Sequence, residues 1–187
     1  MLSMRCRFCD SKEFIQLLDL GFAPPSNSFV NIADRNKPEI NYPLKVNLCI
    51  SCFLAQTEDY TKAEELFTPD YAYFSSNSST LLKHAKDYVD IVEKKLGLTK
   101  KSFVVEIASN DGYLLRNFVR KGIPCLGVEP AIKTAEKAEE LNIKVEKKFF
   151  NQKTTNYLLD KYGKADLIIG NNVLAHVPNI NDFIEGA

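Results

Sequence analysis

The spacing of apolar residues changes near residue 100. Before that point, the stretch "STLLKHAKDYVDIVEKKLG" repeats apolar residues every three or four positions, which predicts an amphipathic helix. Ser78 or Ser79 is placed to cap its start, and Gly97 to end it. The apolar stripe consists of Leu81, Leu82, Ala85, Tyr88, Val89, Val92 and Leu96. His84 lies close to this stripe and is interpreted as a packed or surface helix residue.

After residue 100, short apolar runs alternate with amphipathic segments. The runs predict strands at 103–108, 125–129, 143–146 and 166–170. The segments between them predict helices at about 112–121, 131–141 and 151–162. Repeated strand-helix units imply a parallel sheet with right-handed crossovers.

The first 68 residues have a different character. "FIQLLDLGFAPPSNSFV" and "INYPLKVNLC" are apolar runs interrupted by glycine and proline, which predict brief strands and turns with little core. "TKAEELFTPDYAYFSSNSS" then predicts a short helical turn followed by a polar connector that carries aromatic residues. The chain therefore divides into a lobe at 1–68, a connector and helix at 69–100, and an α/β part at 101–187.

The amino-acid composition limits the kinds of partner that the chain is expected to bind. Of the 187 residues 45% are hydrophobic, and 24 Lys and Arg balance 24 Asp and Glu, so the formal net charge is zero. Without a basic run, no nucleic-acid partner is expected. Without a long apolar run or a secretory signal, no membrane contact is expected and the predicted location is cytoplasmic. Cysteines are then expected to be reduced.

Four of the five cysteines form two C-x2-C pairs, Cys6 with Cys9 and Cys49 with Cys52. Four thiolates in two such turns provide the tetrahedral sulfur shell that suits Zn²⁺, with no position open for water, so the pattern predicts a structural zinc site. Its binding energy would contribute to the folding of the lobe. The alternatives are unrelated thiols or a redox pair. Cys125 lies in an apolar run and is interpreted as a packing residue.

The first strand of the α/β part leads into an acidic, polar corner. "VVEIASNDGYLL" lacks the G-x-G-x-x-G spacing of a pyrophosphate cradle, although Gly112 would let the backbone approach a ligand. Ser109, Asn110 and Asp111 favour turns and helix caps. Asp111 and Glu106 would oppose a phosphate but suit a cationic or hydroxyl-rich ligand. The corner could equally be an ordinary strand-loop-helix turn.

The second predicted strand ends in "LGVEP", which places Glu129 where a carboxylate accepts hydrogen bonds from both ribose hydroxyls. S-adenosylmethionine has a ribose, no phosphate and two cationic groups, so it fits the corner and Glu129 together. A solvated acidic residue at a strand end is the alternative interpretation.

Polar residues also follow the fourth predicted strand. In "IIGNNVLAHVPNINDF", Asn171, Asn172 and His176 lie just past its carboxyl end. A histidine there can act as a base or as a hydrogen-bond donor to a methyl acceptor. It can also simply cap the loop before Pro178.

The combination of "VVEIASNDGYLLRNF", "LGVEPA", "NNVLAHVPNINDFIEG", "YAYFSSNSS" and the two C-x2-C pairs resembles the S-adenosylmethionine-dependent sugar C-methyltransferases. The resemblance implies a small four-cysteine zinc-binding domain followed by a partial Rossmann-like class I methyltransferase parallel sheet. Family members methylate the carbon next to a ketone in nucleotide-linked deoxysugars. Where many of them carry an acidic residue before the "FF" pair, this chain has Lys148.

The resemblance also implies roles for individual residues. Glu106 and the turn from Ser109 to Gly112, with Asn110 and Asp111, would line the methionine part of the cofactor, Glu129 would bind its ribose, and Asn171 would line its pocket. His176 would lie at the sugar, and Tyr71 or Tyr73 would reach in from the connector. His176 and Tyr73 are the candidates to remove a proton from the substrate and to stabilise the resulting enolate.

The family's sheet has seven strands and is followed by a C-terminal domain, so the resemblance implies that the chain is the N-terminal part of such an enzyme, without turnover alone. The fourth strand would then be an exposed edge that favours self-association. Two other functions stay open, a zinc-stabilised binding module and a methyltransferase that acts on another small molecule.

Overall fold

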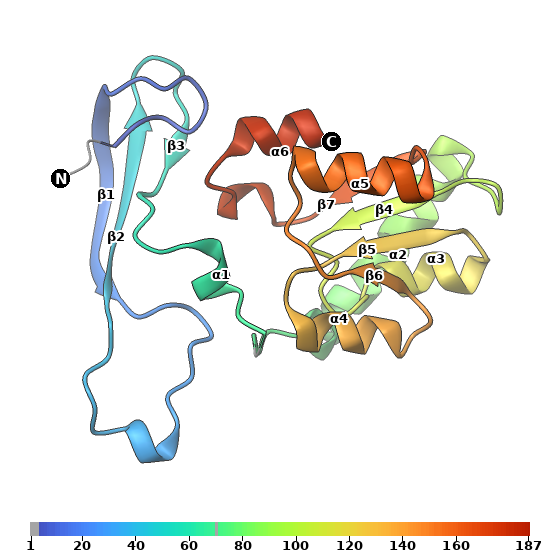
Figure 1. Ribbon diagram of the computed structural model, residues 1–187, viewed down its shortest axis with the longest axis horizontal. Coiled ribbons are helices and arrows are strands. Elements are labelled where there is room, and N and C mark those ends of the chain that lie inside the picture. The colour runs from blue at the N-terminus through green and yellow to red at the C-terminus, as the bar shows by residue number, and fades with distance from the viewer. Residues whose placement is uncertain (1–3, 70) are drawn as a thin grey trace.

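The computed structural model describes residues 4–69 and 71–187 and shows an N-terminal lobe beside an α/β body (Figure 1). The lobe is built on an antiparallel sheet of order β1-β2-β3, and the body on a parallel sheet of order β6-β5-β4-β7. An α/β chain with a cysteine-bearing lobe and a parallel sheet confirms the fold class predicted from the sequence.

The lobe is a long hairpin with little core. Strands β1 (Phe14–Ala23) and β2 (Tyr42–Cys49) pair antiparallel, and β3 (Ala55–Gln56) adds to β2. The prediction of brief strands was wrong for β1, because Gly21 does not end it: with φ 77 it lies in a register shift between Asp19 and Phe22. The loop between β1 and β2 contains the short helix η1 (Ile32–Asp34). Leu17, Leu20 and Phe22 are more than half exposed, as expected of a lobe without its own core.

The connector and first long helix follow the lobe. Helix α1 (Ala63–Leu66) is one turn, η2 (Ser75–Asn77) lies in the connector, and α2 spans Ser79–Leu96. The Ser78 side chain accepts the Leu81 N–H at the start of α2, and Gly97 ends it with φ 64. Both predicted ends are confirmed. Leu96 was wrongly placed in the buried stripe, since it is 52% exposed; the buried residue there is Leu98.

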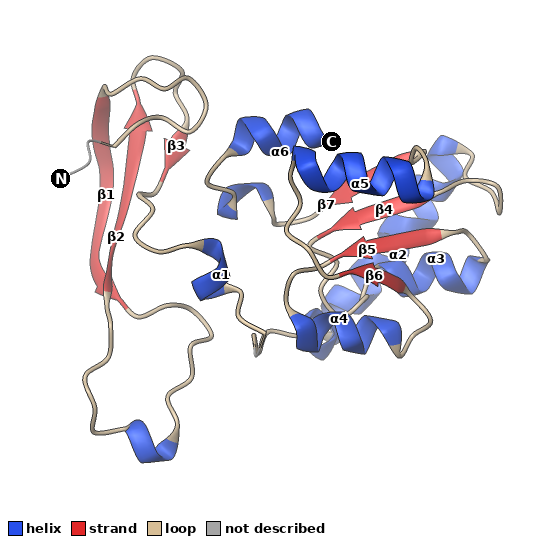
Figure 2. Ribbon diagram, in the orientation of Figure 1, coloured by secondary structure: helices blue, strands red, loops and turns tan. Residues whose placement is uncertain are grey.

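The body is a three-layer sandwich, with helices on both faces of the sheet (Figure 2). Its strands are β4 (Val104–Ile107), β5 (Cys125–Val128), β6 (Lys144–Glu146) and β7 (Leu167–Gly170), and its helices are α3 (Leu115–Lys121), α4 (Ile132–Glu139), α5 (Gln152–Tyr162) and α6 (Ile180–Gly186). A short helix, η3 (Leu174–His176), precedes α6. The predicted alternation of strands and helices is confirmed, with ends shifted by at most three residues.

Alternate residues of β4 face the two cores. Val104 packs in a cluster with Val89 of α2 and Phe118 of α3, whereas Val105 packs with Leu158 of α5 on the other face. Helices α2 and α3 therefore cover one face, and α5 covers the other (Figure 1). The partly buried Cys125 packs against the first cluster.

Strand β7 lies at the edge of the sheet and pairs only with β4 among the described residues. Ile168 on this strand is 37% exposed. Self-association through this edge stays a prediction.

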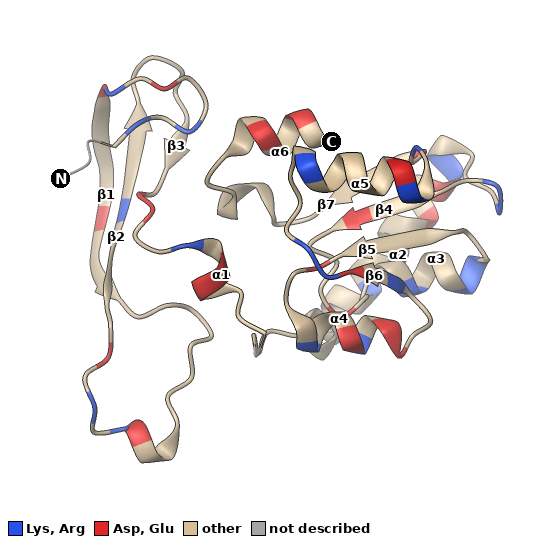
Figure 3. Cartoon of the chain, in the orientation of Figure 1, with Lys and Arg blue, Asp and Glu red and all other residues tan. Residues whose placement is uncertain are grey.

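Within residues 4–69 and 71–187, no helix combines the length and apolar character needed to cross a bilayer. Charges of both signs are spread over the lobe and the body (Figure 3).

Candidate zinc and cofactor sites

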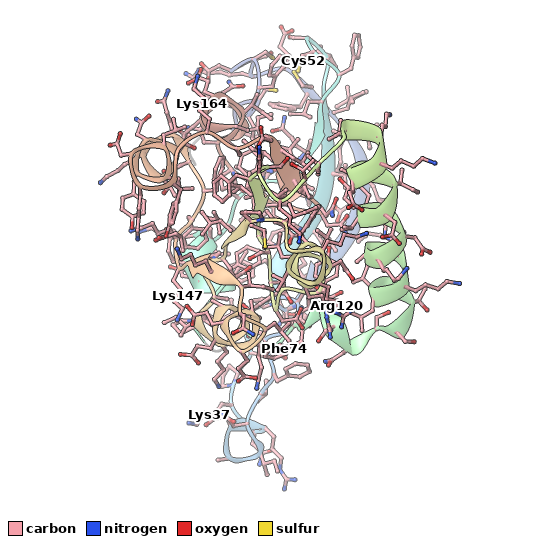
Figure 4. All side chains as sticks on the ribbon, turned by 90° about the vertical axis from the view of Figure 1, so that its right-hand side faces the viewer. Lys37, Cys52, Phe74, Arg120, Lys147 and Lys164 are labelled. Atoms are coloured by element: carbon pink, nitrogen blue, oxygen red, sulfur yellow. The ribbon has the colours of Figure 1, made fainter. Side chains whose placement is uncertain are left out.

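The two C-x2-C pairs meet at one end of the lobe. The four sulfur atoms of Cys6, Cys9, Cys49 and Cys52 lie within 4.8 Å of one another. Cys6 Sγ is 3.5 Å from Cys52 Sγ, and Cys9 Sγ is 3.6 Å from Cys49 Sγ. A tetrahedral site with Zn–S bonds of about 2.3 Å has sulfur atoms about 3.8 Å apart, so the cluster has the size that zinc requires. Cys52 and Lys37, which lies in the loop between β1 and β2, are at opposite ends of the molecule (Figure 4).

The thiols of the cluster have pKa values shifted in opposite directions. Burial raises the pKa of Cys6, but hydrogen bonds from the Cys9 and Phe8 backbone outweigh it and lower that pKa to about 6. The pKa of Cys52 is instead raised to about 12: a backbone hydrogen bond at Leu54 lowers it, but burial and the three neighbouring thiols raise it more. Four thiolates therefore need a compensating positive charge, which a divalent metal ion supplies.

The corner after β4 has a left-handed backbone at alternate positions. Ala108 has φ 53, Asn110 has φ 51 and Gly112 has φ 74. Only glycine adopts this region without strain, and asparagine tolerates it better than alanine. Strain of this kind in a strand-end corner is typical of functional sites. The corner therefore has an unusual backbone even though it lacks the G-x-G-x-x-G spacing.

Asn110 joins this corner to the connector through its side chain. Its Nδ2 donates to the Tyr73 carbonyl at 3.0 Å, and its Oδ1 accepts the Ser75 N–H at 2.9 Å. Beside it, Asp111 Oδ2 accepts the Ser76 N–H at 3.0 Å. Two residues predicted to contact the cofactor thus hold the backbone on either side of Phe74, and so fix where Tyr73 lies.

Gly112 is required by packing. A Cβ at this position would lie 2.4 Å from Ile143 Cδ1 and 3.1 Å from Ala138 Cβ. The space on the side where a Cβ would lie is occupied by protein side chains, and the interpretation that Gly112 brings the backbone close to a ligand stays a prediction. Ser109 is fully buried and its Oγ has no hydrogen-bond partner among the described residues.

Glu129 at the end of β5 is 5% exposed and is held by two backbone amides. Its Oε2 accepts the Asn110 N–H and its Oε1 accepts the Ala131 N–H, both at 2.9 Å. Burial raises its pKa, while these two hydrogen bonds lower it. Each carboxylate oxygen has two lone-pair sites, so the pair of oxygens can still accept two hydroxyl groups from a ligand.

A cavity of about 640 Å³ opens at the carboxyl ends of the parallel strands. Six of the residues predicted for the site line it: Tyr71, Tyr73, Asn110, Glu129, Asn171 and His176. The other four are not among its lining residues: Glu106, Ser109, Asp111 and Gly112. The structure therefore brings the ribose, connector and fourth-strand candidates together, but of the five candidates for the methionine part only Asn110 lines the cavity. The individual roles stay predictions.

Glu106 forms part of the acidic layer at this corner. It is 1% exposed, and its Oε2 has no hydrogen-bond partner among the described residues. Burial, together with the charges of Glu129 and Asp111, raises the pKa of Glu106 well above its usual 4.5. Tyr113 also lines the cavity. Burial and the nearby Glu106 raise the pKa of its hydroxyl group to about 12, although a hydrogen bond with Asn171 lowers it.

The candidates for proton transfer lie on two different segments of the cavity wall. His176 is the last residue of η3 and is exposed, and Tyr73 is 47% exposed in the connector. Tyr71 is partly buried, which raises the pKa of its hydroxyl group, while a hydrogen bond from Asn27 of the lobe lowers it. Two segments far apart in the sequence, the connector and η3, thus contribute to one cavity wall.

Several lining residues were missed by sequence reasoning. The cavity also contacts the following residues: Lys62, Phe67, Tyr113, Lys148, Phe149, Phe150, Pro178 and Phe183. Phe149 and Phe150 lie in the loop that follows β6, and that position after a parallel strand was the available signal. Phe67 carries no such signal, since it ends a one-turn helix at the edge of the lobe.

The structure combines a four-cysteine lobe with a parallel α/β sheet that has a ligand-sized cavity at its strand ends, the architecture that the resemblance implied. Residues 6–67 match the family described as "Putative zinc binding domain". The chain is 27% identical over 97% of its length to the C-methyltransferase NovU from Streptomyces niveus, and spans 43% of that protein. These matches confirm the resemblance seen in the sequence, and relate the chain to a C-methyltransferase.

Two solved structures align with part of this chain. The YcgJ protein from Bacillus subtilis aligns over 56% of this chain and 44% of its own, with a TM-score of 0.41 and 14% identity. The MccD protein aligns over 55% of this chain and 36% of its own, with a TM-score of 0.27 and 13% identity.

Proposed function

We propose that the chain binds zinc in the lobe and S-adenosylmethionine in the 640 Å³ cavity, as the N-terminal part of an enzyme that methylates a carbon of a nucleotide-linked keto-deoxysugar. The observation that carries the cofactor assignment is Glu129, a buried carboxylate at a strand end that lines the cavity and retains free acceptor sites. The relationship to a C-methyltransferase supports the same assignment.

The residues present fit this cofactor better than a dinucleotide. Glu129 takes the Asn110 N–H, one of the corner amides that a phosphate would need, and Asp111 adds a buried acidic group at the same corner. An acidic corner attracts the cationic groups of S-adenosylmethionine and repels a diphosphate. When bound, the cofactor supplies an electrophilic methyl group.

The chain's own residues would prepare the substrate. A carbon next to a ketone must lose a proton before it can accept a methyl group, and the enolate oxygen then needs a hydrogen-bond donor. His176 and the hydroxyl group of Tyr73 or Tyr71 line the same cavity, so they can share the tasks of taking the proton and donating to the oxygen. Because the chain spans 43% of NovU, we expect turnover from a protein that also contains the remaining part, and none from this chain alone.

Calorimetric titration of S-adenosylmethionine into the zinc-loaded chain tests the assignment. Glu129→Gln keeps the shape of the side chain but removes its charge, and we expect binding about 10- to 150-fold weaker, the range for a hydrogen bond to a charged group. Glu146→Gln is the matched control. It alters a carboxylate at the end of the next strand, which bonds to Lys161 and Tyr162 outside the cavity lining.

The outcomes separate the alternatives. Equal affinities of wild type and Glu129→Gln would refute the ribose role. Absence of heat with the wild type would refute cofactor binding, and would favour the other class of function, a zinc-stabilised binding module.

A further inference from the structure

Phe67 lies at the boundary between two cavities. A second cavity of about 370 Å³ is lined by residues of the lobe and by the segment around η3. Phe67 and His176 are two of the six residues that line both cavities, so this pair of rings lies at the boundary between them. The position of Phe67 is thus directly next to a residue proposed for proton transfer.

The Phe67 ring contacts two of the candidate side chains. Its centroid is 5.3 Å from that of Tyr71, with an interplanar angle of 63°, and 6.3 Å from that of His176, with an angle of 76°. Both are edge-to-face arrangements at distances where aromatic pairs attract. Phe67 is therefore the shared neighbour of two rings that come from different segments of the chain.

The backbone of Phe67 is fixed by the lobe side of the molecule. It follows α1, and its N–H donates to the Ala63 carbonyl at 2.8 Å. It is also the last residue of the zinc-domain match. Helix α1 lies between the hairpin and the body (Figure 1), so Phe67 extends the lobe to the cavity.

The histidine, in contrast, lies on a weakly held segment. Leu174 is 45% exposed, Ala175 and His176 are also exposed, and the His176 N–H donates to Val173 within the same turn. A second contact with the lobe follows in α6, where Asn181 Nδ2 donates to the Phe8 carbonyl at 3.0 Å, inside the first C-x2-C pair. The ring of Phe67, at the end of the lobe, is an aromatic neighbour of the His176 imidazole.

We propose that Phe67 is a positioning residue: its ring holds the imidazole of His176 and the phenol of Tyr71 in the orientations that they need in the cavity. The lobe then contributes to the reacting site through Phe67 as well as through its metal. What the positioned groups do rests on the function proposed above, but whether Phe67 holds His176 can be measured without any ligand.

The chain contains only two histidines, His84 and His176, so its imidazole NMR spectrum has one reporter and one internal control. We expect Phe67→Leu to move the His176 signals and to leave those of His84, on the exposed side of α2, in place. Loss of one aromatic pair should reduce the population of the held imidazole orientation by about 2- to 13-fold. Phe67→Tyr keeps the ring and should restore the wild-type position of the His176 signals.

Phe103→Leu is the matched control, because Phe103 is equally half-buried and its ring lies 6.3 Å from that of Tyr162, on the far core of the sheet. Phe67→Met is the second ring-free variant, and replaces Phe67→Leu if that protein does not fold. The proposal is overturned if the His176 signals of the ring-free variants coincide with those of the wild type, or if Phe103→Leu moves them equally. A wild type that binds no S-adenosylmethionine would refute the proposed function, while the same spectra would still decide the role of Phe67.

Discussion

The Asn110 side chain makes two hydrogen bonds with the connector, and two substitutions at this position separate the contribution of the side chain from that of the backbone conformation. Asn110→Gly removes both hydrogen bonds and keeps a residue that adopts φ 51 freely. Asn110→Ala removes the same hydrogen bonds but adds the strain of a Cβ in the left-handed region.

The cost follows from the burial of the partners. Ser75 is 7% exposed, so its N–H loses its partner without access to water, which costs about 1–3 kcal/mol. The Tyr73 residue is 47% exposed, so its carbonyl can bond to water and contributes little. We therefore expect Asn110→Gly to lower the free energy of unfolding by about 1–3 kcal/mol, and Asn110→Ala by about 1 kcal/mol more.

Urea unfolding of the zinc-loaded chain measures the free energies, and amide hydrogen exchange at Ser75 reports the hydrogen bond itself. Asn142 is the matched control, since it is exposed and has φ 61 in the turn between α4 and β6. Asn142→Ala should show the backbone cost alone, and Asn142→Gly should be close to neutral. The reasoning fails if Asn110→Gly costs less than about 0.5 kcal/mol, the usual range of a surface substitution, and the Ser75 amide exchanges as in the wild type.

Two further predictions concern the buried carboxyl group and the thiols. The pKa of Glu106 is raised above its usual 4.5, so above pH 4.5 the folded state keeps the carboxyl proton of Glu106 while the unfolded chain loses it. The contribution of Glu106 to the free energy of unfolding is therefore fully present below pH 4.5. It falls as the pH rises, by up to about 1.4 kcal/mol per pH unit, until the pKa of the folded state is reached. Glu106→Gln should remove this slope in urea unfolding measured from pH 4 to 8, and an unchanged slope would assign it to other groups. Cys49→Ser should lose stoichiometric zinc in metal analysis and expose the amides of β1 and β2 to exchange while the body stays protected, whereas Cys125→Ala should retain the metal.

The elements that the sequence predicted best are those with local signals at both ends. Helix α2 was predicted to within a residue because Ser78 and Gly97 act through their own backbone and side chain. Leu96 was misplaced because periodicity cannot show where the neighbouring layer ends. Strand β1 was misjudged at Gly21, since a glycine in a bulge and a glycine in a turn have the same sequence signal.

Cavity residues that directly follow a strand could be predicted from the sequence. Features of the site that depend on tertiary contacts could not. Glu129 and Asn171 line the cavity as the order of strands and loops implied. Ala108 gave no indication of its left-handed backbone, because alanine is rarely found there. Phe67 reaches the cavity from the lobe, and no rule of local sequence relates a one-turn helix to a strand end more than 100 residues away in the chain.

The corner from Ala108 to Gly112 also shows how a proposed site without the glycine spacing of a pyrophosphate cradle can favour one class of ligand. A phosphate-binding corner needs backbone N–H groups that point into the cavity and are free to donate. Here Glu129 accepts the Asn110 N–H and the Ala131 N–H, and the Asn110 side chain is committed to the connector. A diphosphate would have to displace a buried carboxylate from both amides, whereas a ribose can use the lone pairs that this carboxylate keeps. In the proposed site, the Asn110 side chain thus holds the connector at Tyr73, and the carboxylate that satisfies the corner's amides would favour a cationic, phosphate-free cofactor.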